Sequence, residues 1–202
     1  LRSRLGLARS DTCRRTWCPN CSIIKTHIYL PLMENIVTIG TYRDPRDSII
    51  SIWRAIILDK KDLKVKMSLK DFKLIKKRWD DIINNYNLFK NKNNVFFVKY
   101  ENFYNNFNYV YDLVEQIYNI KLSNSIKEKC CDKYKIENVS KYIKTNLNDK
   151  NFNGFHDKNT LLHNKHIFKG EIGGYKKYMK KELIYYINNK YTDLILDWGY
   201  KL

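Results

Sequence analysis

The chain has 202 residues, and its 38 Lys and Arg against 21 Asp and Glu give a formal net charge of +17. Its hydrophobic content of 44% and aromatic content of 14% exclude a disordered polycation, because disordered chains lack the apolar surface that offsets the entropy lost on ordering. Its apolar runs fall short of the roughly 20 residues that span a membrane, while the positive charge admits nucleic acid, anionic membranes and phosphorylated cofactors as ligands.

The N-terminal residues differ in composition from the rest of the chain. Arginines are concentrated in residues 1–15, whereas Lys, Asn and Tyr dominate from Ile23 onward. We therefore expect an atypical leader over residues 1–22 and one partial domain over residues 23–202. Because the sequence begins at Leu1 without Met or an apolar signal core, we also expect it to be N-terminally incomplete.

The cysteines give a weak indication of a metal site and a clearer one of redox environment. Their number is odd and two are adjacent, which favours a reducing, cytoplasmic location. Three others lie near the N-terminus with a histidine after them: Cys13, Cys18, Cys21 and His27. This spacing loosely resembles a zinc site, but the short Cys pairs of zinc knuckles are absent. An unpaired leader without metal is the favoured interpretation.

Hydrophobic patterns predict an α/β fold with a parallel sheet. Residues 35–42 and 95–100 have the β-branched, apolar composition of buried strands. Helical spacing of apolar residues predicts helices over residues 47–58, 69–89, 104–118, 123–133 and 176–191. Residues 144–166 show no period and are predicted to form a long loop. Strands separated by helices indicate a parallel sheet.

The segment that begins at Arg43 is suited to binding an anion. It follows a predicted strand and opens a helix, where free backbone N–H groups and the helix dipole favour negative charge. Arg43 adds a planar guanidinium that matches phosphate oxygens, and Ser51 adds a hydroxyl donor. In isolation, Arg-Asp-Pro-Arg equally fits a surface turn with a helix-capping Asp.

The same segment is similar to the 3′-phosphate motif of PAPS-dependent sulfotransferases, in which an Arg is followed eight positions later by a Ser. Arg43 and Ser51 fall on these two ligands. Upstream, residues 25–31 (KTHIYLP) resemble the Lys-Thr-His-Leu-Pro segment of the cytosolic branch. The resemblance implies that His27 is the general base and that Lys25 stabilises charge on the bridging oxygen. A lone histidine is otherwise more often a packed or surface residue.

Two later segments continue the resemblance in the family's order. Residues 97–103 look like the strand that ends in Tyr-Glu-Asp-Leu, which implies that Tyr100 reaches the adenine, although a core tyrosine is the ordinary alternative. Residues 166–175 resemble the Arg-Lys-Gly-x-x-Gly-Asp-Trp loop, which implies cofactor contacts from Lys169 and Gly170. Phe168 replaces the loop's Arg, so we expect either weaker cofactor binding or substitution of that Arg by Lys165 and Lys169. Residues 134–139 are similar to the family's adenine segment, without an assigned contact.

The resemblance implies a P-loop-NTPase-like, three-layer α/β domain with a central parallel sheet. The family's first strand and its Pro-Lys-Ser-Gly-Thr-Thr-Trp phosphate loop are missing from this sequence. That loop holds the 5′-phosphosulfate, and each donor it supplies can be worth ~3–4 kcal/mol in the transition state. We therefore expect turnover by this chain to be impaired.

The function implied is transfer of a sulfuryl group from PAPS, as co-substrate and without metal, to a hydroxyl or amine. The acceptor would be a small molecule or a glycan. Two alternatives stay open: a non-catalytic sulfotransferase-like binding protein, and a basic nucleic-acid-binding module. The even spread of lysines and the lack of a recognised binding motif disfavour nucleic acid. The sequence does not determine the oligomeric state.

Overall fold

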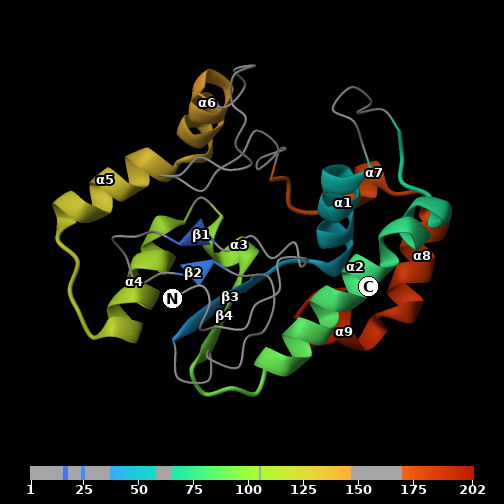
Figure 1. Ribbon diagram of the computed structural model, residues 1–202, viewed down its shortest axis with the longest axis horizontal. Coiled ribbons are helices and arrows are strands. Elements are labelled where there is room, and N and C mark those ends of the chain that lie inside the picture. Colours follow the sequence, from blue (N-terminus) through green and yellow to red (C-terminus); the bar gives the residue numbers. More distant parts are fainter. Residues whose placement is uncertain (1–15, 18–23, 26–36, 58–64, 105, 147–169) are drawn as a thin grey trace, which may run out of the picture.

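The computed structural model describes residues 16–17, 24–25, 37–57, 65–104, 106–146 and 170–202. Figure 1 shows a small sheet with helices on both sides. The strands are β1 (Thr16–Trp17), β2 (Ile24–Lys25), β3 (Thr38–Tyr42) and β4 (Val95–Lys99). The helices are α1 (Pro45–Ile56), α2 (Leu69–Phe89), α3 (Tyr100–Phe103), α4 (Phe107–Tyr118), α5 (Asn124–Tyr134), α6 (Ile136–Asn146), α7 (Tyr175–Tyr178), α8 (Lys181–Lys190) and α9 (Thr192–Asp197).

Strands β3 and β4 form the parallel sheet that the sequence predicts. Their register runs from Thr38 opposite Val95 to Tyr42 opposite Lys99, and α1 and α2 connect them. Gly40 lies opposite the ring of Phe97, and a Cβ at this glycine would be only 2.7 Å from ring atom Cε1. The glycine therefore lets an aromatic ring lie against the strand. The prediction of an α/β fold with a parallel sheet is confirmed.

The short strands β1 and β2 pair antiparallel, with Thr16 opposite Lys25. They lie on either side of the predicted boundary near residue 22, which itself falls in residues 18–23, outside the described part of the chain. The division into a leader over 1–22 and a domain over 23–202 therefore stays a prediction.

Side-chain caps fix where α1 and α2 begin. The Asp44 carboxylate accepts the N–H of Arg46 at 2.8 Å, and Pro45 supplies a first helical residue that needs no partner for its nitrogen. Ser68 and Asp71 form a capping box at the start of α2, in which each side chain accepts the other's backbone N–H. Helix α2 matches the predicted range of 69–89.

Most of the buried core lies on the side of the sheet that α1, α2, α8 and α9 cover (Figure 1). Trp198 packs against Tyr86 at a centroid distance of 5.0 Å and against Tyr42 of β3 at 5.4 Å. Trp79 packs edge-on against Tyr191 at 6.0 Å. These aromatic contacts join the sheet to the C-terminal helices, which positions the β3–α1 junction beside residues 170–202.

Three sequence predictions need correction. The helix predicted over 176–191 is broken into α7 and α8, because Met179 is extended and forms a parallel bridge with Met67. Backbone hydrogen bonds from Met67 N to Tyr178 O, 2.8 Å, and from Lys180 N to Met67 O, 2.9 Å, replace the helical ones. Helix α6 occupies the first residues of the loop predicted over 144–166, and the rest of that loop lies outside the described residues. The sequence also gave no indication of α9.

Among the described residues, none of the helices is both long and apolar enough to cross a membrane.

Candidate functional site

The candidate site is built at the junction of β3 and α1, which brings the Arg43 segment against residues 170–175. Asp44 ends the extended segment and caps α1 through its carboxylate. That carboxylate uses the Arg46 N–H, and Ser48 N binds Asp44 O at 2.9 Å. The expectation of free N–H groups at this helix start is therefore wrong for Arg46 and Ser48. An anion here would depend on side chains instead.

Arg46 neutralises the capping carboxylate and is a structural residue. Its guanidinium donates to both oxygens of Asp44, at 2.9 and 2.7 Å, and also to the Asn188 side chain and to Lys201 O. The same group stacks on the ring of Tyr175 at 4.3 Å. Because every part of this guanidinium is engaged and buried, Arg46 is not available to a ligand.

Asp47 fastens the 170–175 segment to α1. Its Oδ2 accepts the N–H of Gly173 at 2.7 Å, its Oδ1 accepts the N–H of Tyr175 at 2.8 Å, and Arg43 Nη2 lies 3.3 Å from Oδ2. Burial raises the pKa of Asp47, whereas the Tyr175 N–H and the Arg43 guanidinium oppose that rise. Sequence reasoning missed this role. The only signal was an acid four residues after Arg43, which puts the two side chains within reach of each other.

Arg43 lies between α1 and the 170–175 segment, and its guanidinium has one nitrogen held by protein groups and another without a partner among the described residues. Its Nη2 donates to Glu171 O at 3.1 Å as well as pairing with Asp47, and its guanidinium lies over the Tyr100 ring at 4.9 Å. Its Nε is buried and has no acceptor within the described residues. Buried N–H groups are almost always satisfied, so this donor is suited to an added anion.

Tyr100 and Gly170 complete the same corner. The Tyr100 hydroxyl donates to Gly170 O at 3.3 Å, and burial raises the pKa of Tyr100, so this hydroxyl stays protonated. Gly170 has a φ of +63°, and a Cβ there would lie 2.9 Å from Tyr100 Oη and 3.2 Å from Ile136 Cδ1. Both the conformation and the close approach require glycine.

The other predicted site residues are less well defined by the structure. Ser51 is exposed on α1, one turn beyond Asp47 and on the same face of the helix. Lys25 lies in β2, opposite Thr16. His27 and Lys169 lie outside the described residues, as do Phe168 and the predicted cysteine cluster. The structure thus brings together Arg43, Tyr100 and Gly170 among the predicted residues.

The described residues contain no group of three or more His, Cys, Asp or Glu that could hold a metal ion. Within the same ranges, Cys130 and Cys131 are free thiols on α5.

Comparison with known proteins gives one family and one fold. A profile of the family described as the sulfotransferase domain matches residues 16–199. No curated protein matches the chain. Mouse sulfotransferase SULT7A1, solved in complex with PAP, is 19% identical with a TM-score of 0.56, over 77% of this chain and 56% of that chain.

A second solved structure is retinol dehydratase in complex with androsterone and inactive cofactor PAP. It is 19% identical over 85% of this chain and 50% of that chain, with a TM-score of 0.49. The chain thus spans about half the length of either protein. At this level of identity, the likeness to the mouse enzyme establishes the fold.

Proposed function

The chain belongs to the sulfotransferase domain family, and on this premise we propose that it binds PAPS, with Arg43 as the ligand of the 3′-phosphate. The observation that carries the proposal is the state of the Arg43 guanidinium. Asp47 and Glu171 fix its Nη2, while its buried Nε lacks an acceptor among the described residues. Leaving a buried donor unsatisfied costs about 1–3 kcal/mol, which a phosphate oxygen would recover.

The surroundings of Arg43 fit a nucleotide phosphate in charge and shape. The guanidinium is oriented by its contacts before a ligand arrives, so little side-chain entropy is lost on binding. Its side chain keeps 23% of its surface exposed, which gives a ligand access from one side. Tyr100 offers an aromatic face beside it, as the resemblance implies for adenine. The PAP complex of the mouse relative supports a ligand of this class.

The remaining roles rest on the family resemblance. We propose that Ser51 and Lys169 add donors to the 3′-phosphate, with the Gly170 backbone close to the cofactor. His27 would accept the proton of an acceptor hydroxyl or amine, and Lys25 would stabilise charge on the bridging oxygen. PAPS, when bound, supplies the sulfuryl group to be transferred. The acceptor is proposed to be a small molecule or a glycan.

A thermal-shift titration with adenosine 3′,5′-bisphosphate tests the proposed ligand. At 100 times its Kd, a ligand of the native state stabilises by about 2.7 kcal/mol, so we expect a saturable rise in Tm for the wild type. Arg43→Ala should lose this rise. Arg78→Ala is the matched control, because Arg78 is an exposed arginine on α2 and should behave as wild type.

Either of two results would contradict the proposal: an undiminished shift in Arg43→Ala, or no shift in a folded wild type. Catalysis is tested separately with His27→Ala, which should abolish sulfuryl transfer from PAPS while keeping the thermal shift. Loss of the shift together with transfer would instead assign His27 to binding.

A further inference from the structure

We propose that the lysine-rich surface at the start of α2 and around α7 is a binding surface for anionic lipid membranes. This inference is independent of the proposed PAPS site. We call this surface the lysine face, and its members come from two segments far apart in the sequence. They are Lys66, Lys70, Lys73, Lys77, Lys176, Lys177, Lys180 and Lys181.

The bridge between Met67 and Met179 brings the two segments together. Met67 N donates to Tyr178 O at 2.8 Å, and Lys180 N donates to Met67 O at 2.9 Å. Both methionines are buried, whereas Lys66 and Lys180, each next to one of them in the chain, are exposed. In Figure 1 the start of α2 lies beside α7 and the start of α8. The lysines of both segments therefore meet at one end of the molecule.

The charge of the lysine face is not neutralised locally. Every one of its lysines is exposed, and none has a carboxylate partner within the described residues. Of the nearby acids, Asp71 is already engaged in the capping box with Ser68, and exposed Asp81 and Glu182 are two carboxylates against eight lysines. A cluster of unpaired charges of one sign raises the local concentration of anions and steers them to the surface.

Exposed aliphatic side chains lie among these lysines. Val65 is 44% exposed, Leu69 37% and Leu74 66%. On α2, Leu74 follows Lys70 by four residues and precedes Lys77 by three, so the three side chains are neighbours on the helix surface. Aliphatic side chains surrounded by lysines match a lipid surface, where the chains enter the acyl boundary and the lysines remain at the headgroups.

The composition of the lysine face favours lipid over nucleic acid. Nucleic-acid surfaces use the fork of arginine for phosphate and base contacts and aromatic rings for stacking. Beside the eight lysines of the lysine face lie one exposed arginine, Arg78, and one exposed aromatic ring, Tyr185, and the large apolar residues exposed beside its α2 lysines are aliphatic. Point charges without geometric demands suit the mobile headgroups of an anionic leaflet.

The lysine face is continuous with the candidate site. Tyr175 begins α7 and donates its N–H to Asp47, and Lys176 and Lys177 follow it directly. A membrane bound at the lysine face would therefore lie near the 170–175 segment.

Vesicle sedimentation of the full chain tests the inference. We expect binding to vesicles of equimolar phosphatidylcholine and phosphatidylserine but not to phosphatidylcholine alone. Each lysine contributes about 1 kcal/mol near such a surface, so the triple variant Lys70→Glu, Lys73→Glu, Lys77→Glu should lose at least about five-fold in partition coefficient per position. The matched control reverses the same number of charges on exposed lysines elsewhere: Lys129→Glu, Lys133→Glu, Lys141→Glu.

The control triple variant should keep most of the wild-type binding. High salt screens surface charges, so the binding that persists there should depend on aliphatic contacts, and Leu74→Ser should weaken it. Equal losses in the two triple variants would overturn the inference, since they would reflect net charge alone. Absence of wild-type sedimentation with phosphatidylserine would also overturn it. The inference would likewise be overturned if the chain bound an unrelated duplex oligonucleotide through the same lysines and did not bind vesicles.

Discussion

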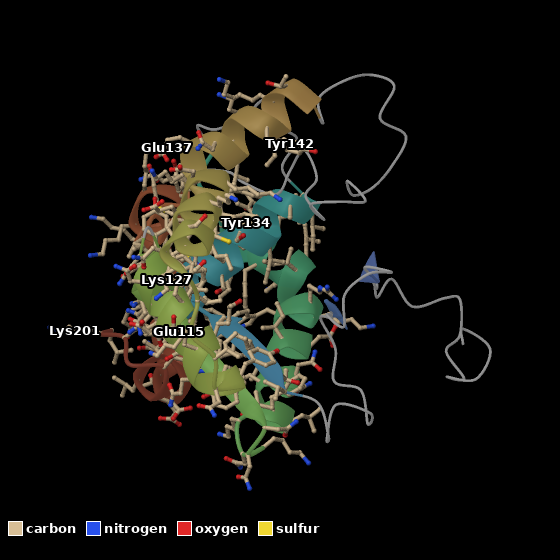
Figure 2. The ribbon with its side chains drawn as sticks, turned by 90° about the vertical axis from the view of Figure 1, so that its left-hand side faces the viewer. Glu115, Lys127, Tyr134, Glu137, Tyr142 and Lys201 are labelled. Carbon is tan, nitrogen blue, oxygen red and sulfur yellow. The ribbon has the colours of Figure 1, made fainter. Side chains whose placement is uncertain are left out.

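The start of α1 and the attachment of helix α5 both rely on charged side chains, but they bury them to different degrees. At α1 the guanidinium of Arg46 and the carboxylates are all buried, whereas buried Glu115 of α4 pairs with lysines whose side chains are 90% and 28% exposed. Asp44, Arg46 and Asp47 are buried, and Arg46 and Asp47 make hydrogen bonds to residues more than a hundred positions away. Helix α5 has no buried residue, and two side chains of α4 contact its Lys127: the Glu115 carboxylate, and the Tyr111 hydroxyl, which donates to Lys127 O at 2.5 Å. Glu115 accepts from Lys127 Nζ at 2.9 Å, Lys121 Nζ at 3.1 Å and Leu122 N at 2.9 Å. Figure 2 shows Glu115 and Lys127 close together on neighbouring helices.

This difference shows which region of the fold depends on one fixed arrangement of side chains. A buried charge that loses its partner is costly, so a network such as that of Asp47 permits one arrangement of the 170–175 segment. Exposed ion pairs contribute little and tolerate movement. The candidate phosphate site thus lies in the part of the molecule whose geometry is most strictly determined, whereas α5 is attached to it more loosely.

The largest expected effect comes from removing the centre of the buried network. Asp47→Ala leaves the N–H groups of Gly173 and Tyr175 without acceptors and removes the partner of Arg43. We expect a loss of about 3–5 kcal/mol in the free energy of unfolding, measured by urea denaturation. Asp81→Ala, an exposed acid on α2, is the control and should cost less than about 0.5 kcal/mol. Similar losses of stability in Asp47→Ala and Asp81→Ala would contradict the proposed difference between buried and exposed carboxylates.

Alanine substitutions at two glycines of the 170–175 segment distinguish the cost of backbone strain from the cost of close packing. Gly170 and Gly173 both have positive φ, at +63° and +74°, so Gly173→Ala should cost about 1–2 kcal/mol through strain alone. Gly170→Ala meets Tyr100 Oη at 2.9 Å as well, whereas nothing lies within 4 Å of a Cβ at Gly173. We therefore expect Gly170→Ala to destabilise more and to weaken bisphosphate binding. Equal losses of stability in Gly170→Ala and Gly173→Ala would contradict this expectation, because they would mean that the Tyr100 side chain moves aside at no cost.

The contacts of the Glu115 carboxylate at α5 should make the stability of the protein depend on pH. Lys127, the N–H of Leu122 and Lys121 lower the pKa of Glu115 to about 2 from its usual 4.5. A depressed pKa in the folded state adds stability that is complete above pH 4.5 and is lost as the pH falls toward 2. As the pH falls from 4.5 toward 2, the free energy of unfolding should therefore decrease less in Glu115→Gln than in the wild type. Parallel curves of urea midpoint against pH would contradict the role of Glu115.

The smallest effect is expected from the more exposed of the two lysines at Glu115. The Lys121 side chain is 90% exposed, so Lys121→Ala should change stability by less than about 0.5 kcal/mol. The Lys127 side chain is only 28% exposed and makes the shorter contact, so Lys127→Ala should cost more. Denaturant midpoints of the two variants measure this order, and the reverse order would contradict it.

Local patterns predicted the parts of the fold that local forces determine. Apolar periodicity gives α2 at its observed bounds, and strand composition gives β3 and β4. The break between α7 and α8 was not predictable, because it depends on Met67, more than a hundred residues earlier. A helical pattern cannot reveal that a distant strand residue will take over its hydrogen bonds.

The candidate site was predictable in its residues but not in its connections. The order of family-like segments selected Arg43, Tyr100 and Gly170, and the structure brings these three together. Asp47 was missed as the central acceptor, because its partners are backbone N–H groups of Gly173 and Tyr175, which carry no side-chain signature. The capping role of Asp44 was weighed only as an alternative to anion binding, and the structure assigns it.

Isothermal titration calorimetry with adenosine 3′,5′-bisphosphate and adenosine 5′-phosphate tests most directly whether Arg43 holds a 3′-phosphate. A charge-assisted hydrogen bond is worth about 1.5–3 kcal/mol, so we predict that the wild type binds the bisphosphate at least about ten-fold more tightly. Arg43→Ala should lose most of this preference, because Ser51 and Lys169 are the donors proposed to remain at the 3′-phosphate. Equal affinities in the wild type, or a preference undiminished in Arg43→Ala, would contradict the assignment of Arg43 to the 3′-phosphate.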